Sequence, residues 1–237
     1  DSIAGEMGAN GKRLLDKGQN VLMASFTEKL MVLLLARLVN FIPGAGIWMN
    51  TQRPEWNDAN NALVGNGASM VTLYYLRRMV SFLKKLYKRA GGGYEVREEV
   101  VRLFSAVKMT LGKYLPEPDK DIDDKLRKKI TDELGEAGSS YRRDVYRAFS
   151  ERYKILEDTE IVSLLDDVSS HIDQSIKSNR RDDGLYTAYN LVNISDSSIT
   201  VRPLDEMLEG QVAALSSDIL RPDEAAGSGH HHLPISR

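Results

Sequence analysis

The fold class is decided by residues 69–87, which read SMVTLYYLRRMVSFLKKLY. The apolar side chains of this stretch recur every three or four residues, so they lie on one face of an α-helix. They are Met70, Leu73, Leu76, Val80, Leu83 and Leu86. We therefore expect a long helix whose apolar face is buried against other helices.

Helical spacing continues along most of the chain. Residues 20–41 predict a largely buried helix, and residues 95–114 predict another. The charged stretch 119–135 has a narrow apolar stripe, which predicts a helix on the surface. Ser140 is the expected N-cap of a separate helix, and Thr159 is the expected N-cap of the next one.

The last third of the chain changes in character. Residues 185–194 are rich in β-formers and residues 198–201 can pair with them, so a β-hairpin is expected. A helix from Pro203 to about Leu215 should follow, with Pro203 in its first turn. Gly210 weakens that helix, so we expect a packing contact that requires a glycine there. The whole pattern predicts a mainly α protein with one short hairpin.

A polar loop at residues 44–68 separates the first two predicted helices. Its centre, residues 53–61, reads RPEWNDANN and combines carboxylates, an indole, amides and a guanidinium. Carbohydrate sites need this mixture, because an aromatic ring stacks on the sugar, polar groups bind its hydroxyls and an acid protonates the glycosidic oxygen. Asp58 is the candidate acid. The candidate substrate-binding residues of the loop are Arg53, Glu55, Trp56, Asn57, Asn60 and Asn61. A helix cap at Asp58 and a core role for Trp56 are the alternatives.

The loop also resembles a known family. Trp56-Asn57-Asp58, the turn at Gly65 and Gly67, and the apolar helix after Ser69 are similar to the Trp-Asn-Asp segment of cellobiose-phosphorylase-like enzymes, within the (α/α)6-barrel glycosidases. The similarity covers about residues 45–80. In that family the Asp of the motif is the general acid, and the resemblance assigns this role to Asp58.

The resemblance implies that the chain is part of an (α/α) toroid or barrel. Its 237 residues supply too few helices for the whole barrel, so a fragment of a larger polypeptide is expected. Residues 1–114 would be barrel helices that carry the loop. Residues 115–178 would be a peripheral helical insertion, and residues 179–237 would return to the barrel with the hairpin, a helix and a flexible tail.

Two further segments supply candidate site residues. Arg181, Asp183 and Tyr186 follow a predicted helix and again mix charge with an aromatic ring, although a charged turn before an edge strand explains them equally well. Glu206 and Glu209 share one face of the last predicted helix. Glu209 is the second candidate catalytic carboxylate, and the alternative is a pair of solvated glutamates.

Three functions remain open from the sequence. An inverting phosphorylase would use inorganic phosphate as nucleophile and would need no protein base. We slightly favour this hypothesis. An inverting hydrolase would need a second carboxylate to position water, for which Glu209 is the first choice. The third is a non-catalytic helical scaffold or glycan-binding module. No cofactor is expected beyond phosphate as a co-substrate.

The composition limits which kinds of partner and cofactor we expect. A net charge of −2 gives no reason to expect nucleic acid or an anionic membrane surface, and the apolar run at residues 30–36 is too short to cross a bilayer. The absence of Cys excludes disulfides, thiolate catalysis and Cys-ligated zinc. His230-His231-His232 resembles a metal cluster or a tag. The simplest interpretation is a flexible tail, so no metal is expected. The expected partners are an oligosaccharide or glucoside and the remainder of the polypeptide, with the cytoplasm as the default compartment.

Overall fold

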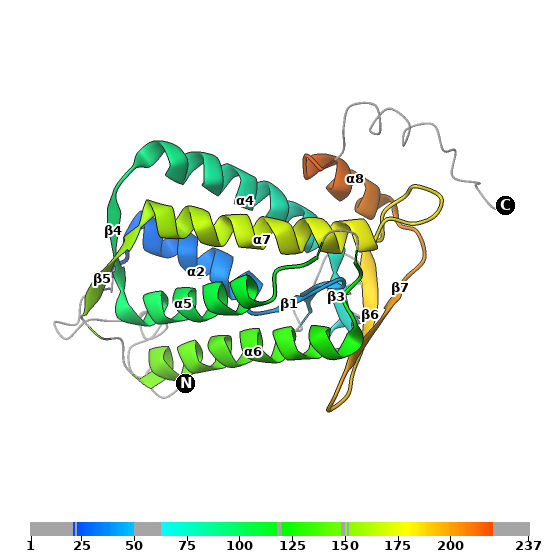
Figure 1. Cartoon of the computed structure of the whole chain (residues 1–237), viewed down its shortest axis with the longest axis horizontal. Helices are drawn as coiled ribbons and strands as arrows, with labels where there is room; N and C mark the ends of the chain where they lie inside the picture. The colour runs from blue at the N-terminus through cyan, green and yellow to red at the C-terminus, as the bar shows by residue number, and fades with distance from the viewer. Residues whose placement is uncertain are drawn as a thin grey trace.

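A computed structural model describes residues 21, 23–49, 63–117, 120–147, 150 and 152–219. Six helices and seven strands occur in these residues (Figure 1). The helices are α2 (Phe26–Leu38), α4 (Met70–Ala90), α5 (Glu98–Lys113), α6 (Asp124–Arg147), α7 (Asp158–Ser178) and α8 (Leu208–Ser216). The strands are β1 (Phe41–Ile42), β2 (Gly46–Trp48), β3 (Gly67–Ser69), β4 (Gly93–Arg97), β5 (Tyr153–Glu157), β6 (Tyr189–Ile194) and β7 (Ile199–Pro203).

The long helices run side by side along the long axis of the molecule (Figure 1). Helix α4 packs against α7 and α8, while α5 packs against α2, α6 and α7. Their apolar faces meet in one core, in which Leu73, Val107 and Leu165 are fully buried. The Ser69 hydroxyl caps α4 by accepting a hydrogen bond from the Thr72 amide at 3.0 Å, so the apolar face begins at a defined residue.

A five-stranded antiparallel sheet lies at one end of the helices, with the strand order β1-β2-β3-β6-β7 (Figure 1). Trp48 of β2 pairs with Ala68 of β3. Gly67 of β3 pairs in turn with Leu191 of β6. The sheet therefore joins two segments that the four intervening helices separate in the sequence.

Buried polar side chains tie this sheet to the helices. The Arg127 guanidinium of α6 donates to the carbonyl oxygens of Pro43 at 2.8 Å and Ile199 at 2.7 Å. The Asn179 amide at the end of α7 donates to the Gly44 carbonyl at 2.8 Å and accepts from the Asn190 amide at 2.8 Å. These bonds satisfy backbone groups of the β1–β2 turn and orient the sheet on the helices.

A two-stranded ribbon of β4 and β5 lies at the opposite end (Figure 1). Glu28 of α2 and Arg97 of β4 fasten it to the helices through a buried ion pair, with 2.6 Å between Oε1 and Nη1. Glu28 Oε2 also accepts a hydrogen bond from the Arg97 amide at 3.1 Å. The pair fixes the start of α5, which begins directly after Arg97.

The expectation of a mainly α fold that forms part of an (α/α) toroid or barrel is wrong, because strands from two antiparallel sheets occupy both ends of the described helices. The strands are two to six residues long, too short for apolar alternation to show in the sequence. Residues 44–49 and 63–68, expected to belong to a polar loop, include β2 and the first two residues of β3. The predicted hairpin is present, and in it Ile194 of β6 pairs with Ile199 of β7.

Several helix boundaries also differ from the prediction. Helix α6 continues through Ser140, so no separate helix starts there. The N-cap of α7 is Glu157 instead of Thr159. Pro203 ends β7, and α8 begins only at Leu208. The division at residues 114 and 178 remains a prediction, while the core takes side chains from all three predicted segments.

Candidate functional site

The candidate residues of the Trp-Asn-Asp loop lie outside the described residues. They are Arg53, Glu55, Trp56, Asn57, Asp58, Asn60 and Asn61. The structure does describe Met49 before the loop and residues 63–67 after it, and we call these the loop neck. The structure therefore describes the residues that flank the loop on both sides.

Backbone hydrogen bonds close the loop neck. The Gly65 amide donates to the Met49 carbonyl at 2.8 Å, and the Met49 amide donates to the Gly67 carbonyl at 3.0 Å. Gly67 must be a glycine, because a Cβ there would lie 2.8 Å from the Leu63 side chain and 3.0 Å from the Asn190 carbonyl oxygen. The neck is thus held tightly against the edges of β2, β3 and β6.

Arg181, Asp183 and Glu206 form a charged cluster after the end of α7. The Arg181 guanidinium forms ion pairs with Asp183, at 3.4 Å between Nε and Oδ2, and with Glu206. The Leu185 amide donates to Asp183 Oδ1 at 2.9 Å, and this bond and Arg181 lower the pKa of the Asp183 carboxyl. All three side chains remain partly exposed, so they can still contact a ligand.

Tyr186, which follows this cluster in the sequence, belongs to the core. Its ring is 6% exposed and packs edge-on against Tyr74, with 6.2 Å between the ring centroids. Tyr74 donates its hydroxyl to the Thr187 carbonyl at 3.0 Å, and burial raises its pKa above the usual range. In the described arrangement the Tyr186 ring therefore belongs to the core and not to the exposed charged cluster.

Helix α8 is clamped against the same segment. The Gln211 side chain accepts from the Tyr186 amide at 2.9 Å and donates to the Tyr186 carbonyl at 2.7 Å. A Cβ on Gly210 would lie 3.0 Å from that carbonyl oxygen and 3.0 Å from the Ala188 Cβ, which confirms the expected packing contact at this glycine. Glu209, the second candidate carboxylate, is half-buried in the first turn of this clamped helix.

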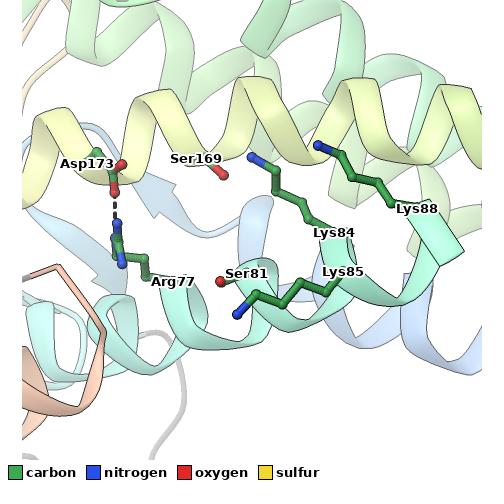
Figure 2. A pocket seen from close by; sticks show the side chains of 7 residues that line it. All are labelled: Arg77, Ser81, Lys84, Lys85, Lys88, Ser169 and Asp173. Carbon is green, nitrogen blue, oxygen red and sulfur yellow. Dashed lines mark hydrogen bonds and ion pairs between the residues drawn. The ribbon is translucent and has the colours of Figure 1, made fainter.

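The far end of α8 is held by Arg77 of α4. Figure 2 shows its ion pair with Asp173 of α7, for which the distance from Nε to Oδ1 is 2.6 Å. Arg77 also donates from Nη1 to the Ser217 carbonyl at 2.6 Å. The helix that carries Glu209 is thereby fixed at both ends.

A small apolar cluster joins the loop neck to the charged cluster. Its buried members are Leu63, Ala188 and Tyr189, and its partly buried members include Met49, Leu204 and Met207. Met49 and Leu63 lie at the two ends of the Trp-Asn-Asp loop, and Met207 directly follows Glu206. We call this group the neck cluster. It brings the described flanks of the loop and the residue after Glu206 into one apolar cluster.

A separate basic groove of about 250 Å³ lies between α4 and α7 (Figure 2). Figure 2 shows that Lys84 and Lys88 extend from α4 toward α7. Lys84 is paired with Asp166 at 2.6 Å, which neutralises part of the positive charge. None of the residues that line the groove belongs to the loop neck or the charged cluster, so it is not part of the candidate site.

Within the described ranges, no three acidic or histidine side chains come close enough together to hold a metal ion. Among the same residues, no helix combines the length and apolar character needed to cross a bilayer.

Comparison of the chain with models of known protein families and with curated proteins found no match. Functional inference therefore rests on the residues and their geometry. Sequence reasoning missed Gln211, although Gly210 beside it gave a signal of close packing. It also missed the pairing of Arg181 with Glu206, because the two residues lie on different segments.

Proposed function

We propose that this chain contributes a saccharide site in which Asp58 acts as the general acid on a glycosidic bond. Support comes from the composition of the Trp-Asn-Asp loop, which matches the chemistry of carbohydrate sites. The single observation that carries the proposal is the neck cluster, in which Met49 and Leu63 at the ends of that loop pack with Met207. The described flanks of the loop and the residue next to Glu206 thus belong to one apolar cluster.

The proposal assigns roles to both segments. Trp56 stacks on a sugar ring, and Arg53 and the amides of the loop bind its hydroxyls. Arg181 and Asp183, which are partly exposed, offer a donor and an acceptor to further hydroxyls. The proposal depends on these side chains and needs no (α/α) barrel around them.

Phosphorolysis with inversion is the reaction we favour. Asp58 gives its proton to the leaving oxygen while phosphate attacks the anomeric carbon from the opposite face, which yields a sugar 1-phosphate. In the hydrolytic alternative a carboxylate must position water. Glu209 is the candidate for that role because α8 is clamped to the Tyr186 segment by Gln211.

The test is turnover of glucosides by the complete polypeptide, with and without phosphate. Asp58→Asn should lower the rate by about 10²–10⁴, the usual contribution of a general acid. Asp196→Asn is the matched control, because Asp196 is an exposed acid in the β6–β7 turn and should leave the rate unchanged. Unchanged turnover in Asp58→Asn would exclude this acid.

Product analysis separates the two reactions. Sugar 1-phosphate that forms only when phosphate is present supports phosphorolysis. Free sugar that forms equally well without phosphate identifies a hydrolase, in which Glu209→Gln should then abolish turnover. Saccharide binding without any turnover would refute the catalytic role and leave glycan recognition as the function of the loop.

A further inference from the structure

A groove of about 540 Å³ lies between α6 and the five-stranded sheet. This volume is within the range of pockets that take small ligands, about 300–1,000 Å³. The residues that line it are Val39, Asn40, Ile42, Trp48, Thr131, Asp132, Gly135, Glu136, Ser139, Arg142 and Ile194. Like the Trp-Asn-Asp loop, this set combines an indole, two carboxylates, an amide and a guanidinium. We propose that the groove is a second saccharide subsite, with Trp48 as its stacking platform.

Trp48 has the placement that a stacking platform needs. It is a half-buried residue of β2 that packs against the buried apolar group of Ile42, Ala68 and Val192, and it also lines the groove. The Trp48 amide donates to the Asn40 carbonyl at 2.7 Å, and this bond fixes the backbone of the residue that carries the ring. A rigid indole held in this way offers an apolar surface to the C–H face of a sugar and an N–H donor to a hydroxyl.

Helix α6 supplies the polar wall of the groove. Asp132, Glu136 and Ser139 are spaced by four and three residues, so they lie on one face of the helix. Lys128 pairs with Asp132 at 2.5 Å and Arg143 pairs with Glu136 at 2.6 Å. Charges of both signs are interspersed along this wall, which suits a neutral ligand with many hydroxyls better than an anion or a cation.

One polar atom of this wall has no hydrogen-bond partner among the described residues. The Thr131 hydroxyl oxygen is buried and forms no hydrogen bond with the described residues. A buried hydroxyl that lacks a partner is unfavourable, and a hydroxyl group of a ligand would satisfy it. Arg142, which donates to Ser139 Oγ at 3.1 Å, is exposed and offers further donors at the same wall.

Two glycines of α6 differ in what a Cβ atom would meet at each position. A Cβ on Gly138 would lie 2.9 Å from the Val39 side chain, so helix packing accounts for this glycine. A Cβ on Gly135 would meet no atom of the described residues within 4 Å, although Gly135 also lines the groove. Position 135 therefore faces open space in the groove, and a side chain larger than that of Ala would extend into it.

The groove is continuous in the chain with the proposed site. Trp48 precedes Met49, which begins the loop neck, so the strand that carries the platform leads directly into the Trp-Asn-Asp loop. The subsite deepens the proposed function and relies on it for the class of ligand.

The chain has two tryptophans, and this makes the two sites separately observable. We would label them with 5-fluorotryptophan and assign the ¹⁹F resonances with Trp48→Phe and Trp56→Phe. Cellobiose, maltose and longer glucans are then titrated into the whole chain, with polyethylene glycol as the non-sugar control. The proposal expects saturable shifts of the Trp48 resonance with at least one saccharide and none with polyethylene glycol.

Gly135→Leu should fill the groove without a steric clash and weaken the Trp48 response at least tenfold. Gly135→Ala is the matched control and should keep that response, while circular dichroism should show that both variants are folded. A shift of the Trp56 resonance alone would overturn the subsite and leave the proposed function standing. A Trp48 response that survives Gly135→Leu would also overturn it. The absence of any saccharide response at either tryptophan would overturn both proposals.

Discussion

The buried pair of Glu28 and Arg97 allows a quantitative prediction about stability. Their side chains are only 5% and 3% exposed, and Arg97 Nη2 also donates to the Met23 carbonyl at 2.7 Å. Arg97→Met would leave the Glu28 carboxylate buried without its cation. Loss of one partner from a buried pair costs about 3–5 kcal/mol, so the free energy of unfolding should fall by that amount. For a domain of this size, this corresponds to a decrease in Tm of roughly 6–20 °C.

The double variant gives the sharper test. Glu28→Gln removes the charge but retains an acceptor for the Arg97 amide, which now donates to Glu28 Oε2 at 3.1 Å. In Glu28→Gln/Arg97→Met no uncompensated charge remains, so most of the stability lost in Arg97→Met should return. The two substitutions should therefore be strongly non-additive.

Urea unfolding followed by circular dichroism at pH 7 measures these free energies. Lys120→Met is the control, because Lys120 and its partner Glu117 are 67% and 71% exposed, and it should change stability by less than about 0.5 kcal/mol. A loss below about 1 kcal/mol in Arg97→Met, or a double variant whose loss equals the sum of the single losses, would refute the reasoning.

Three further predictions concern the loop neck, a buried histidine and α8. Gly67→Ala should lower the free energy of unfolding by about 1–3 kcal/mol, because its Cβ would lie within 3.0 Å of neighbouring atoms. Gly135→Ala should instead raise the free energy of unfolding by up to about 1 kcal/mol. Urea unfolding measures both variants, and equal effects would contradict the packing argument. Burial lowers the pKa of His171 despite its bond to the Leu111 carbonyl, so the unfolded chain binds more protons and stability should fall as the pH drops below about 6.5. His171→Gln should flatten this pH dependence, measured by urea unfolding at pH 5.5 and 7.5. An unchanged dependence would exclude His171 as its source. Arg77→Met should speed hydrogen exchange in α8, because the 2.6 Å hydrogen bond from Arg77 to the Ser217 carbonyl at the end of that helix is lost. Lys84→Met is the control and should leave the exchange in α8 unchanged. Equal exchange in both variants would show that Arg77 does not hold α8.

Local periodicity was enough to predict the main helices and one hairpin. The stretch at residues 69–87 became α4, and the apolar positions Leu73, Val80 and Leu83 are buried as its spacing requires. The pairing of β6 with β7 was also predictable, because a short turn connects two β-rich runs. In these elements the residues that interact are near one another in the sequence, so the pattern itself contains the information.

The candidate site was predictable only in its parts. Residue chemistry drew attention to Arg181 and Asp183, but the pairing of Arg181 with Glu206 and the clamp made by Gln211 join separate segments. The groove at Trp48 brings together β2, α6 and β6, which no spacing in the sequence connects. Tyr186 was a candidate substrate-binding residue, yet its ring is buried against Tyr74.

The sequence by itself determined where the main long helices lie and which of their faces are buried, because helical periodicity is a property of neighbouring residues. Only the tertiary structure decided that short strands would form sheets at both ends of the helices. A pairing such as that of Gly67 with Leu191 depends on backbone hydrogen bonds between distant segments, which side-chain patterns do not encode. The same long-range pairing brought Met49, Leu63 and Met207 into one apolar cluster, a grouping that no sequence spacing predicts.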